Sequence, residues 1–358
     1  MKFFRYTMWM IFLGFNLSSL GWDTATRADE LSPIGEDSFS IVVIPDTQQY
    51  YGANTKREPD STAPVTNSTF DAWTDWIEAN IDSQRIAFVS HVGDIVDRNQ
   101  ASEWTVARQC MDKLHGKVPY GLCVGNHDME GKSGNSSLFQ EYFPKTRFTG
   151  FDWYGSCFER SEKKQQVSGN NANSYQLFTA CGMDFVILHI ECNAPDNVLE
   201  WADDVLQTHR SRRAIITTHM DLGPVEKPKK ARDYYDAPKG RMKWSKCHGN
   251  DGNSPQQMWK KCFRKHANVF LMLCGDQSRS QACRLESTGD SGNRVHSLLS
   301  DYGVYGLRLL RFHPSRNEIE VVTWDPIKQE RCRSTNIVPD ESQHQFTLEY
   351  QMAPVASE

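Results

Sequence analysis

The sequence has no excess of basic charge, since 40 Lys and Arg residues stand against 45 Asp and Glu residues and the net charge is −5. Surfaces that bind nucleic acid are usually strongly basic, so the composition carries no nucleic-acid-binding signature. The chain lacks a C-x-x-C pair, which argues against a zinc ribbon or a thioredoxin-type motif, and it lacks the G-x-S-x-G sequence of many serine hydrolases. Beyond the N-terminus no segment reaches transmembrane length.

The N-terminus has the layout of a secretory signal peptide over residues 1–28. Lys2 and Arg5 precede an apolar stretch at 8–20, and small residues are frequent at 21–28. The apolar stretch is too short to span a bilayer comfortably, so we expect cleavage within 21–28 and a secreted or periplasmic protein. An uncleaved membrane anchor is the alternative.

All ten cysteines lie beyond this segment. In an exported protein an even count favours disulfides over metal–thiolate sites, although the sequence does not fix their connectivity. Buried free thiols are the alternative. The local candidate pairs are Cys157 with Cys181, Cys247 with Cys262, and Cys274 with Cys283.

Residues 38–338 alternate short apolar runs with helical patterns, which predicts one α/β domain followed by a polar, loosely held tail at 339–358. The runs are rich in β-branched residues, as in strands covered on both faces. Because helical patterns separate several of them, we expect a largely parallel sheet, with an antiparallel hairpin near the end. The strand runs lie at 39–44, 86–90, 118–124, 185–190, 214–218, 269–274, 306–312 and 318–323, and the helical patterns at 70–81, 104–114, 198–209 and 255–266.

Five of these strands are followed by side chains that can ligate a metal. The carboxyl ends of parallel strands meet at one edge of a sheet, so the side chains are expected to converge. Mixed oxygen and nitrogen ligation suits Mn, Fe, Zn or Co better than Ca or Mg alone. Turn preference explains any single Asp or Asn, but not the repeated pattern. The residues are Asp46, Asp94, Asn126 with His127, His219, and Asp276, three of them directly after a glycine.

Two segments, GDIVD at 93–97 and GNHD at 125–128, resemble the GDxxD and GNHD motifs of the calcineurin-like metallophosphoesterases. PDTQ at 45–48 is similar to that family's DxH motif with Gln48 in place of histidine, and TTH at 217–219 is similar to its lone metal histidine. The agreement in order and spacing runs over about 40–282. The resemblance implies an α/β fold with mixed β-sheets in a four-layer sandwich flanked by helices.

The resemblance also implies a ligand set for one or two divalent metal ions. Asp94 would bridge the two ions. Asp46 would ligate the first ion, with Gln48 as a weak ligand through its carbonyl oxygen. Asn126 and His219 would ligate the second.

His127 would lie outside the metal shell and face the phosphate. From there it could protonate the leaving alkoxide or stabilise charge on the phosphoryl oxygens. Asp97 would hydrogen-bond to His127 and fix its tautomer. The implied activity is attack by a metal-bound hydroxide on a phosphate mono- or diester, carried by a small-molecule or polymeric substrate.

The sequence departs from the family at its last motif, since GHxH is replaced by GDQS at 275–278. Asp276 could replace the first histidine as an oxygen ligand of the second ion, whereas Ser278 is a poor substitute for the other. With Gln48 also replacing a histidine, the first site suits a harder metal such as Mn or Mg. The alternative function is a catalytically silent relative that binds a ligand or partner.

One pair of residues on a predicted strand and three predicted loops are further candidates for contributing to the site. His189 and Glu191 share one face of a predicted strand, where a satisfied core pair is favoured over a ligand role. Loops at 50–66, 131–137 and 223–255 are expected to lie over the metal edge and to set the substrate. The basic run at 227–232 within the last loop is either solvated or placed to meet an anionic substrate.

Overall fold

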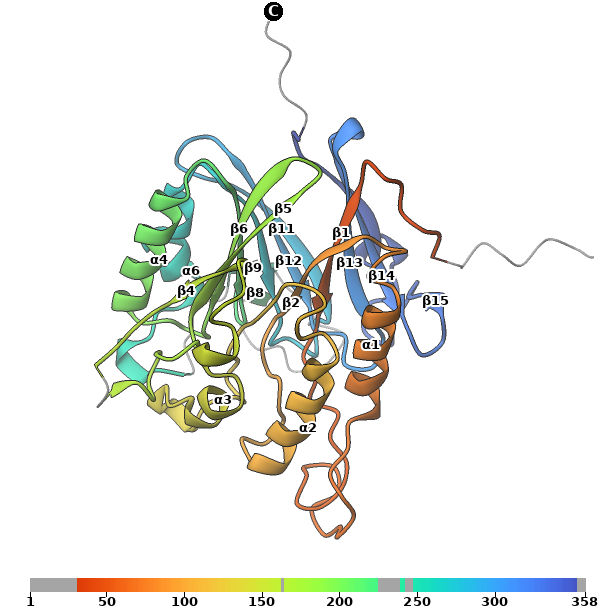
Figure 1. Cartoon of the computed structure of the whole chain (residues 1–358), viewed down its shortest axis with the longest axis vertical. Coiled ribbons are helices and arrows are strands. Elements are labelled where there is room, and N and C mark those ends of the chain that lie inside the picture. The colour runs from red at the N-terminus through yellow and green to blue at the C-terminus, as the bar shows by residue number, and fades with distance from the viewer. Residues whose placement is uncertain (1–30, 162–163, 225–238, 242–246, 353–358) are drawn as a thin grey trace, which may run out of the picture.

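The computed structural model describes residues 31–161, 164–224, 239–241 and 247–352 of the 358-residue chain. Two seven-stranded sheets lie face to face, and helices cover the outer face of each (Figure 1). The predicted four-layer α/β sandwich with mixed sheets is therefore confirmed. The proposed signal segment and the basic run at 227–232 lie outside the described residues. Among the helices of the described part, none is long and apolar enough to cross a bilayer.

The first sheet contains the N-terminal strands together with the C-terminal hairpin. β1 (Phe39–Ile44), β2 (Ile86–His91) and β3 (Tyr120–Leu122) are parallel. On its other side β1 pairs antiparallel with β13 (Leu307–His313), which pairs antiparallel with β14 (Glu318–Asp325). The far side of β14 pairs antiparallel with β15 (Glu330–Arg331) and β16 (Gln345–Glu349).

The second sheet has a parallel centre and antiparallel edges. Its parallel strands, in spatial order, are β12 (Arg294–Ser300), β10 (Val269–Cys274), β7 (Arg213–Thr218) and β6 (Met183–Ile190). The antiparallel strands at its edges are β11 (Ala282–Thr288), β5 (Ser174–Ala180) and β4 (Tyr154–Cys157). A separate two-stranded ribbon pairs β8 (Leu222–Pro224) with β9 (Lys239–Arg241).

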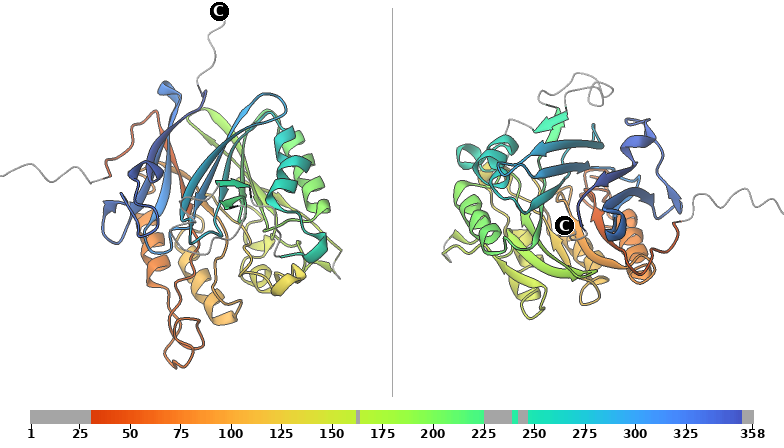
Figure 2. Two further views of the ribbon diagram at one scale, coloured as in Figure 1. Left: turned by 180° about the vertical axis from the view of Figure 1, so that it is seen from behind. Right: turned by 90° about the horizontal axis from the view of Figure 1, so that it is seen from above.

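The apolar runs form strands because both of their faces find cover. In β1, Ile41 and Val43 pack into the core between the sheets, whereas Val42 and Ile44 pack toward the helices. The helices over the first sheet are α1 (Ser68–Ala79), α2 (Ala101–Asp112) and the short α3 (Ser137–Tyr142), and those over the second are α4 (Asp196–Thr208) and α6 (Pro255–Lys261). Seen from above, the two groups of helices lie on opposite sides of the sandwich (Figure 2).

Helix starts follow local capping signals. The side chain of Asn67 accepts a hydrogen bond from the main-chain N–H of Phe70, which caps α1. Ser254 and Gln257 form a capping box ahead of α6. The helix predicted at 255–266 is shorter in the structure, where α6 ends at Lys261 and a 3₁₀ turn, Phe263–Lys265, follows.

The C-terminal tail is not loosely held as predicted. β16 pairs along β14, with Leu348 opposite Ile319, and the Leu348 and Met352 side chains are buried in the core between the sheets. The apolar residues of this short strand are too few to stand out from its polar neighbours in the sequence. Residues 353–358 lie outside the described part.

The predicted disulfides are not formed, since all ten cysteines are free thiols. Cys157 and Cys181 lie at opposite ends of β5, because Cys157 pairs with Ser174 and Cys181 follows Ala180. Cys274 and Cys283 are both level with Leu299 but on opposite sides of β12. Two strand spacings, about 9–10 Å, exceed the reach of a disulfide. Cys247 and Cys262 belong to different apolar clusters.

We expect ten alkylatable thiols in the purified protein when it is unfolded without reductant. Intact mass after iodoacetamide treatment in denaturant measures the count directly. A count of eight or fewer would show that at least one disulfide forms and would contradict the arrangement described above.

Candidate metal centre

Strand ends from both sheets meet at one edge of the sandwich. Asp46 follows β1 and Asp94 follows β2 in the first sheet, while His219 follows β7 and Asp276 follows β10 in the second. The contact between the sheets is direct, since Nε2 of His219 lies 3.1 Å from Oδ1 of Asp94. The predicted convergence of ligand-type side chains is therefore present in the structure.

Asp94 lies at the centre of the group. Its backbone has a positive φ of 49°, and its side chain is buried. Oδ1 accepts a hydrogen bond from the main-chain N–H of His127 at 2.9 Å, and Oδ2 accepts one from Nε2 of Gln48 at 2.9 Å. Burial alone would raise the pKa of Asp94, but the neighbouring His219 holds it below its usual range. The side chain is thus fixed as a carboxylate.

His219 is fully buried and oriented by its other ring nitrogen. Nδ1 lies 2.9 Å from the main-chain carbonyl of Val92, so Nδ1 carries the proton and donates it to that oxygen. Nε2 then faces Oδ1 of Asp94 and, at 3.7 Å, Oδ1 of Asp276. A main-chain carbonyl that fixes the tautomer in this way is the usual support of a metal-binding histidine.

Asp46 and Asp276 face each other across the two sheets. The main-chain N–H of Asp276 lies 3.3 Å from Oδ2 of Asp46. Burial raises the pKa of Asp46 well above its usual range, and the nearby Asp301 adds to this effect. The close approach requires Gly275, because a Cβ atom there would lie 2.1 Å from Oδ1 of Asp46. Gly125 has the same function beside Asp94, where a Cβ atom would lie 2.2 Å from Oδ1.

Replacing Gly275 by alanine should therefore displace the Asp46 carboxylate and weaken metal binding by about 10- to 100-fold, the usual cost of disturbing the support of a ligand. Isothermal titration with Mn²⁺ measures the change. Gly35→Ala is the matched control, since a Cβ atom at Gly35 meets nothing within 4 Å. Equal Mn²⁺ affinity in the two variants would contradict the assigned role of Gly275.

Two predicted ligands, Gln48 and Asn126, and the excluded Ser278 have distinct positions. Gln48 presents its amide nitrogen to Asp94, so it supports a ligand through a hydrogen bond instead of offering its carbonyl oxygen. Asn126 is half-buried beside His127 at the same edge. Ser278, considered a poor substitute ligand, is exposed.

His127 is held by the main chain of Asp97 and not by its carboxylate. Nδ1 of His127 lies 2.7 Å from the Asp97 carbonyl oxygen and 3.6 Å from its Oδ1. The carboxylate instead lies 3.1 Å from Nζ of Lys56. The ring is about one-third exposed, so it can contact a bound substrate.

Asp128 and Glu103 hold the two motif loops in place, a function that the sequence analysis did not assign. Asp128 is fully buried, and its carboxylate accepts the main-chain N–H groups of Val96 and Gly125 at 3.1 and 2.8 Å. Glu103 accepts the N–H groups of Asp97 and Arg98, both at 2.8 Å. The final Asp of the GNHD segment was the available signal for Asp128.

His189 is a satisfied core residue, as favoured from the sequence. Its ring nitrogens lie 3.0 Å from Ser90 Oγ and 2.7 Å from Gln176 Oε1. The predicted pair of His189 with Glu191 is not formed, because the buried Glu191 carboxylate instead lies 3.5 Å from Nε2 of His248. Neither belongs to the group around Asp94.

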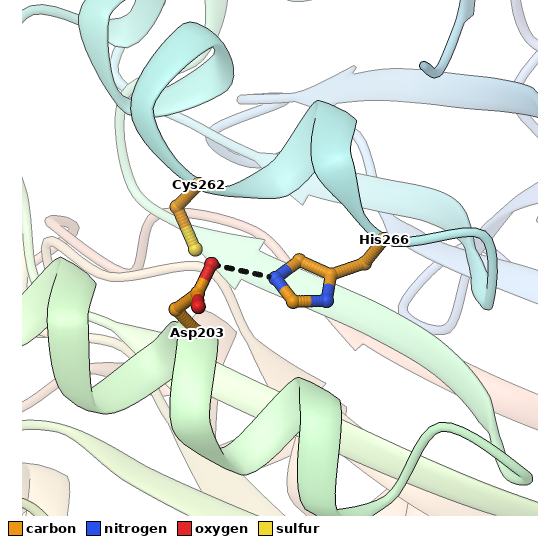
Figure 3. Close-up of side chains that lie close together, drawn as sticks. All are labelled: Asp203, Cys262 and His266. Atoms are coloured by element: carbon orange, nitrogen blue, oxygen red, sulfur yellow. Dashed lines mark hydrogen bonds and ion pairs between the residues drawn. The ribbon is translucent and has the colours of Figure 1, made fainter. Parts of the chain in front are cut away.

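A second group of ligand-type side chains lies in the helix layer, where Asp203 on α4 meets Cys262 and His266 beyond α6 (Figure 3). Nε2 of His266 lies 3.0 Å from Oδ1 of Asp203, which is an ordinary histidine–carboxylate pair. The Asp203 side chain is 44% exposed and the His266 ring stays paired with it, so the group leaves no buried atom that needs a metal. We therefore assign this group a structural role at the junction of two helices.

The group around Asp94 passes a test for metal binding. Oδ1 of Asp46 is buried without a hydrogen-bond partner among the residues that the structure describes, and Nε2 of His219, whose ring proton is on Nδ1, faces the Asp94 carboxylate at 3.1 Å. An unpaired buried polar atom costs about 1–3 kcal/mol, and two facing lone pairs repel each other unless a proton or a cation lies between them. Both atoms belong to the cluster in which Asp46, Asp94 and His219 offer ligand atoms within 4.8 Å of one another. A divalent cation satisfies both atoms.

A four-layer sandwich with carboxylates and an imidazole at its strand ends defines a class of metal-binding α/β proteins. The sequence model of the calcineurin-like phosphoesterases matches residues 39–244. The chain belongs to this family, as the GDIVD and GNHD segments predicted.

The individual proteins that resemble this chain share only a small part of its sequence. The chain is 26% identical over 334 residues to a Bacillus subtilis (strain 168) protein named "Uncharacterized protein YvnB", with 90% of this chain and 22% of YvnB covered. The chain thus spans about a fifth of that relative's length. Purple acid phosphatase PPD1 from yellow lupin seeds has a TM-score of 0.50 at 14% identity, covering 90% of this chain and 55% of that one. A dimetal phosphatase from Danio rerio has a TM-score of 0.44 at 12% identity, covering 87% and 99%. The likeness to the lupin enzyme concerns the fold.

Proposed function

We propose that this protein is an exported metal-dependent phosphoesterase that hydrolyses a phosphate mono- or diester. The observation that carries the proposal is the buried cluster of Asp46, Asp94 and His219, in which Oδ1 of Asp46 has no hydrogen-bond partner among the described residues and Nε2 of His219 faces the Asp94 carboxylate at 3.1 Å. One or two divalent ions, Mn, Fe, Zn or Mg, are held by Asp46, Asp94, Asn126, His219 and Asp276. Export rests on the signal-like layout of residues 1–28.

The bound cation supplies Lewis acidity and lowers the pKa of water at the site. Gln48 and the main-chain N–H of His127 keep the two Asp94 oxygens in place. His127 stands partly exposed at the same edge, with Nδ1–H donated to the Asp97 carbonyl and Nε2 available to a substrate. In its imidazolium form the ring can donate a proton to the leaving oxygen.

The test begins with the full chain expressed in the periplasm of a bacterial host. Bound metal is counted by elemental analysis. Hydrolysis of p-nitrophenyl phosphate and bis-p-nitrophenyl phosphate is then measured with Mn²⁺, Mg²⁺, Zn²⁺ or Fe²⁺ added after chelator treatment. The proposal expects at least one equivalent of metal and turnover of one ester class that EDTA abolishes. Mass spectrometry of the mature N-terminus is expected to find a start within or just after residues 21–28.

Measuring metal content and turnover separately distinguishes an active enzyme from a silent metal-binding relative. Metal binding without turnover of either ester would favour the silent relative, for which the GDQS segment at 275–278 is the supporting observation. Neither metal nor turnover under any of the four cations would overturn the proposal. An intact N-terminus in the membrane fraction would replace cleavage by an uncleaved anchor, and an intact chain in the cytoplasm would overturn the export part alone.

A further inference from the structure

Asp301 stands where β12 ends, at the same edge as the metal centre. β12 runs parallel to β10, and Leu299 lies opposite Cys274. Two residues further on, Asp301 is therefore level with Asp276. This sixth strand end does not stand out in the sequence, because the RVHSLLS segment at 294–300 carries Arg, His and Ser among its apolar residues.

The Asp301 side chain is buried among the proposed ligands. The residue is 4% exposed, and its carboxyl group is close enough to that of Asp46 for the two to share a hydrogen bond. Asp94, Asp276 and His219 are its other charged neighbours. Four carboxyl groups thus surround one imidazole.

Such a group is unfavourable unless a cation is bound. Burying a carboxylate costs several kcal/mol, and like charges within a few ångströms add to that cost. A hydrogen bond between Asp46 and Asp301 leaves Oδ1 of Asp46 without a partner among the described residues, and Nε2 of His219 still faces the Asp94 carboxylate at 3.1 Å. Both atoms lie in the cluster that also contains Asp94. A divalent cation at this position would be attracted to the carboxylates and would accept the Nε2 lone pair at the same time.

We propose that Asp301 is a metal ligand and supplies the oxygen donor that the centre needs in place of the histidines missing from its last motif. This inference rests on the proposed function only for the presence of a divalent cation. With Asp301 the proposed ligands are four carboxylates, the Asn126 amide and one imidazole, an oxygen-rich set. Such a set favours Mn²⁺ or Mg²⁺ relative to Zn²⁺, compared with a centre containing more histidines.

The experiment compares Mn²⁺ and Zn²⁺ dissociation constants of the full chain with those of Asp301→Asn and Asp301→His, by calorimetry after chelator treatment. Asp301→Asn should weaken Mn²⁺ binding by at least about 10-fold. Asp301→His should shift the preference toward Zn²⁺, since imidazole suits that ion. Asp325→Asn is the matched control, because Asp325 is also 4% exposed but its carboxylate accepts the main-chain N–H groups of Ile327 and Lys328.

Unchanged Mn²⁺ affinity and unchanged metal preference in both Asp301 variants would overturn the inference and would leave the phosphoesterase proposal intact. Weaker Mn²⁺ binding in Asp301→Asn, with no ester hydrolysis by the parent chain, would support the ligand role while the phosphoesterase proposal fails. A parent chain that binds no divalent ion would overturn both. Thermal unfolding in EDTA distinguishes loss of a ligand from loss of the fold, and Asp301→His gives a gain of Zn²⁺ preference that a structural role does not produce.

Discussion

Replacing Asp94 by asparagine should abolish metal binding and hydrolysis while the chain still folds. Asp94 is the carboxylate closest to His219, and both of its oxygens are fixed by hydrogen bonds from Gln48 and His127. Asparagine keeps the shape but removes the charge. Since even the hydrogen-bond partners of metal ligands cost about 10- to 100-fold in affinity, loss of the ligand itself should cost at least about 100-fold.

The measurement is the shift in melting temperature that added Mn²⁺ produces. A ligand that binds only the folded state stabilises it by about 2.7 kcal/mol at 100 times its dissociation constant. The parent chain should show this shift and Asp94→Asn should not. In EDTA the variant should melt somewhat lower than the parent but still unfold cooperatively, because the ion pair with His219, which lowers the pKa of Asp94, is lost.

Asp203→Asn is the control for this comparison. It alters the carboxylate of the helix-layer group, which also contains a cysteine and a histidine (Figure 3). Its Mn²⁺ shift should equal that of the parent chain. A shift that disappears in Asp203→Asn and persists in Asp94→Asn would reverse the assignment of the two groups.

Replacing His127 by glutamine should leave metal binding unchanged and lower kcat by about 10²- to 10⁴-fold, the usual contribution of general acid–base catalysis. The side chain of His127 is fixed through the Asp97 main chain, and only its own main-chain N–H contacts Asp94. That N–H remains in the variant. The loss should be larger for an alkyl phosphate than for an aryl phosphate, because an alkoxide needs a proton more than a phenolate does.

Two companion variants sharpen this prediction. Asp97→Asn should have a much smaller effect than His127→Gln, because the main-chain carbonyl that holds the ring is retained. His209→Gln, a half-exposed histidine outside the site, should have none. Equal losses for aryl and alkyl esters in His127→Gln would remove the role in leaving-group protonation. Loss of metal binding in His127→Gln would show that His127 is a metal ligand.

Much of the fold followed from hydrophobic patterning. The runs at 39–44 and 269–274 match β1 and β10 residue for residue, because each is apolar apart from Ser40 and covered on both faces. The edge strands β4, β11 and β16 were not predicted, since their polar side chains face solvent and leave no continuous apolar run. The prediction of disulfides was wrong because the distance between two cysteines depends on which strands lie between them, and the sequence does not show this.

The site was predictable where ligand types follow strongly apolar strands. Asp46, Asp94, His219 and Asp276 were found for this reason, and they converge. The finer contacts could not be derived. Whether Asp97 reaches His127 by its carboxylate or its carbonyl depends on the conformation of one loop, which Glu103 fixes from a neighbouring helix. Asp301 was missed together with its strand.

The distribution of the ligand-type residues over both sheets has a consequence for assembly. Asp46 and Asp94 belong to the first sheet, and His219, Asp276 and Asp301 to the second. Neither half of the sandwich can hold a cation alone, so the centre forms only after the two halves have docked through the aromatic contacts between them, such as that of Phe39 with Phe185. A bound ion then acts as a cross-link that prevents the halves from sliding apart at this edge. Removing it should speed amide exchange first at the ends of β1 and β10.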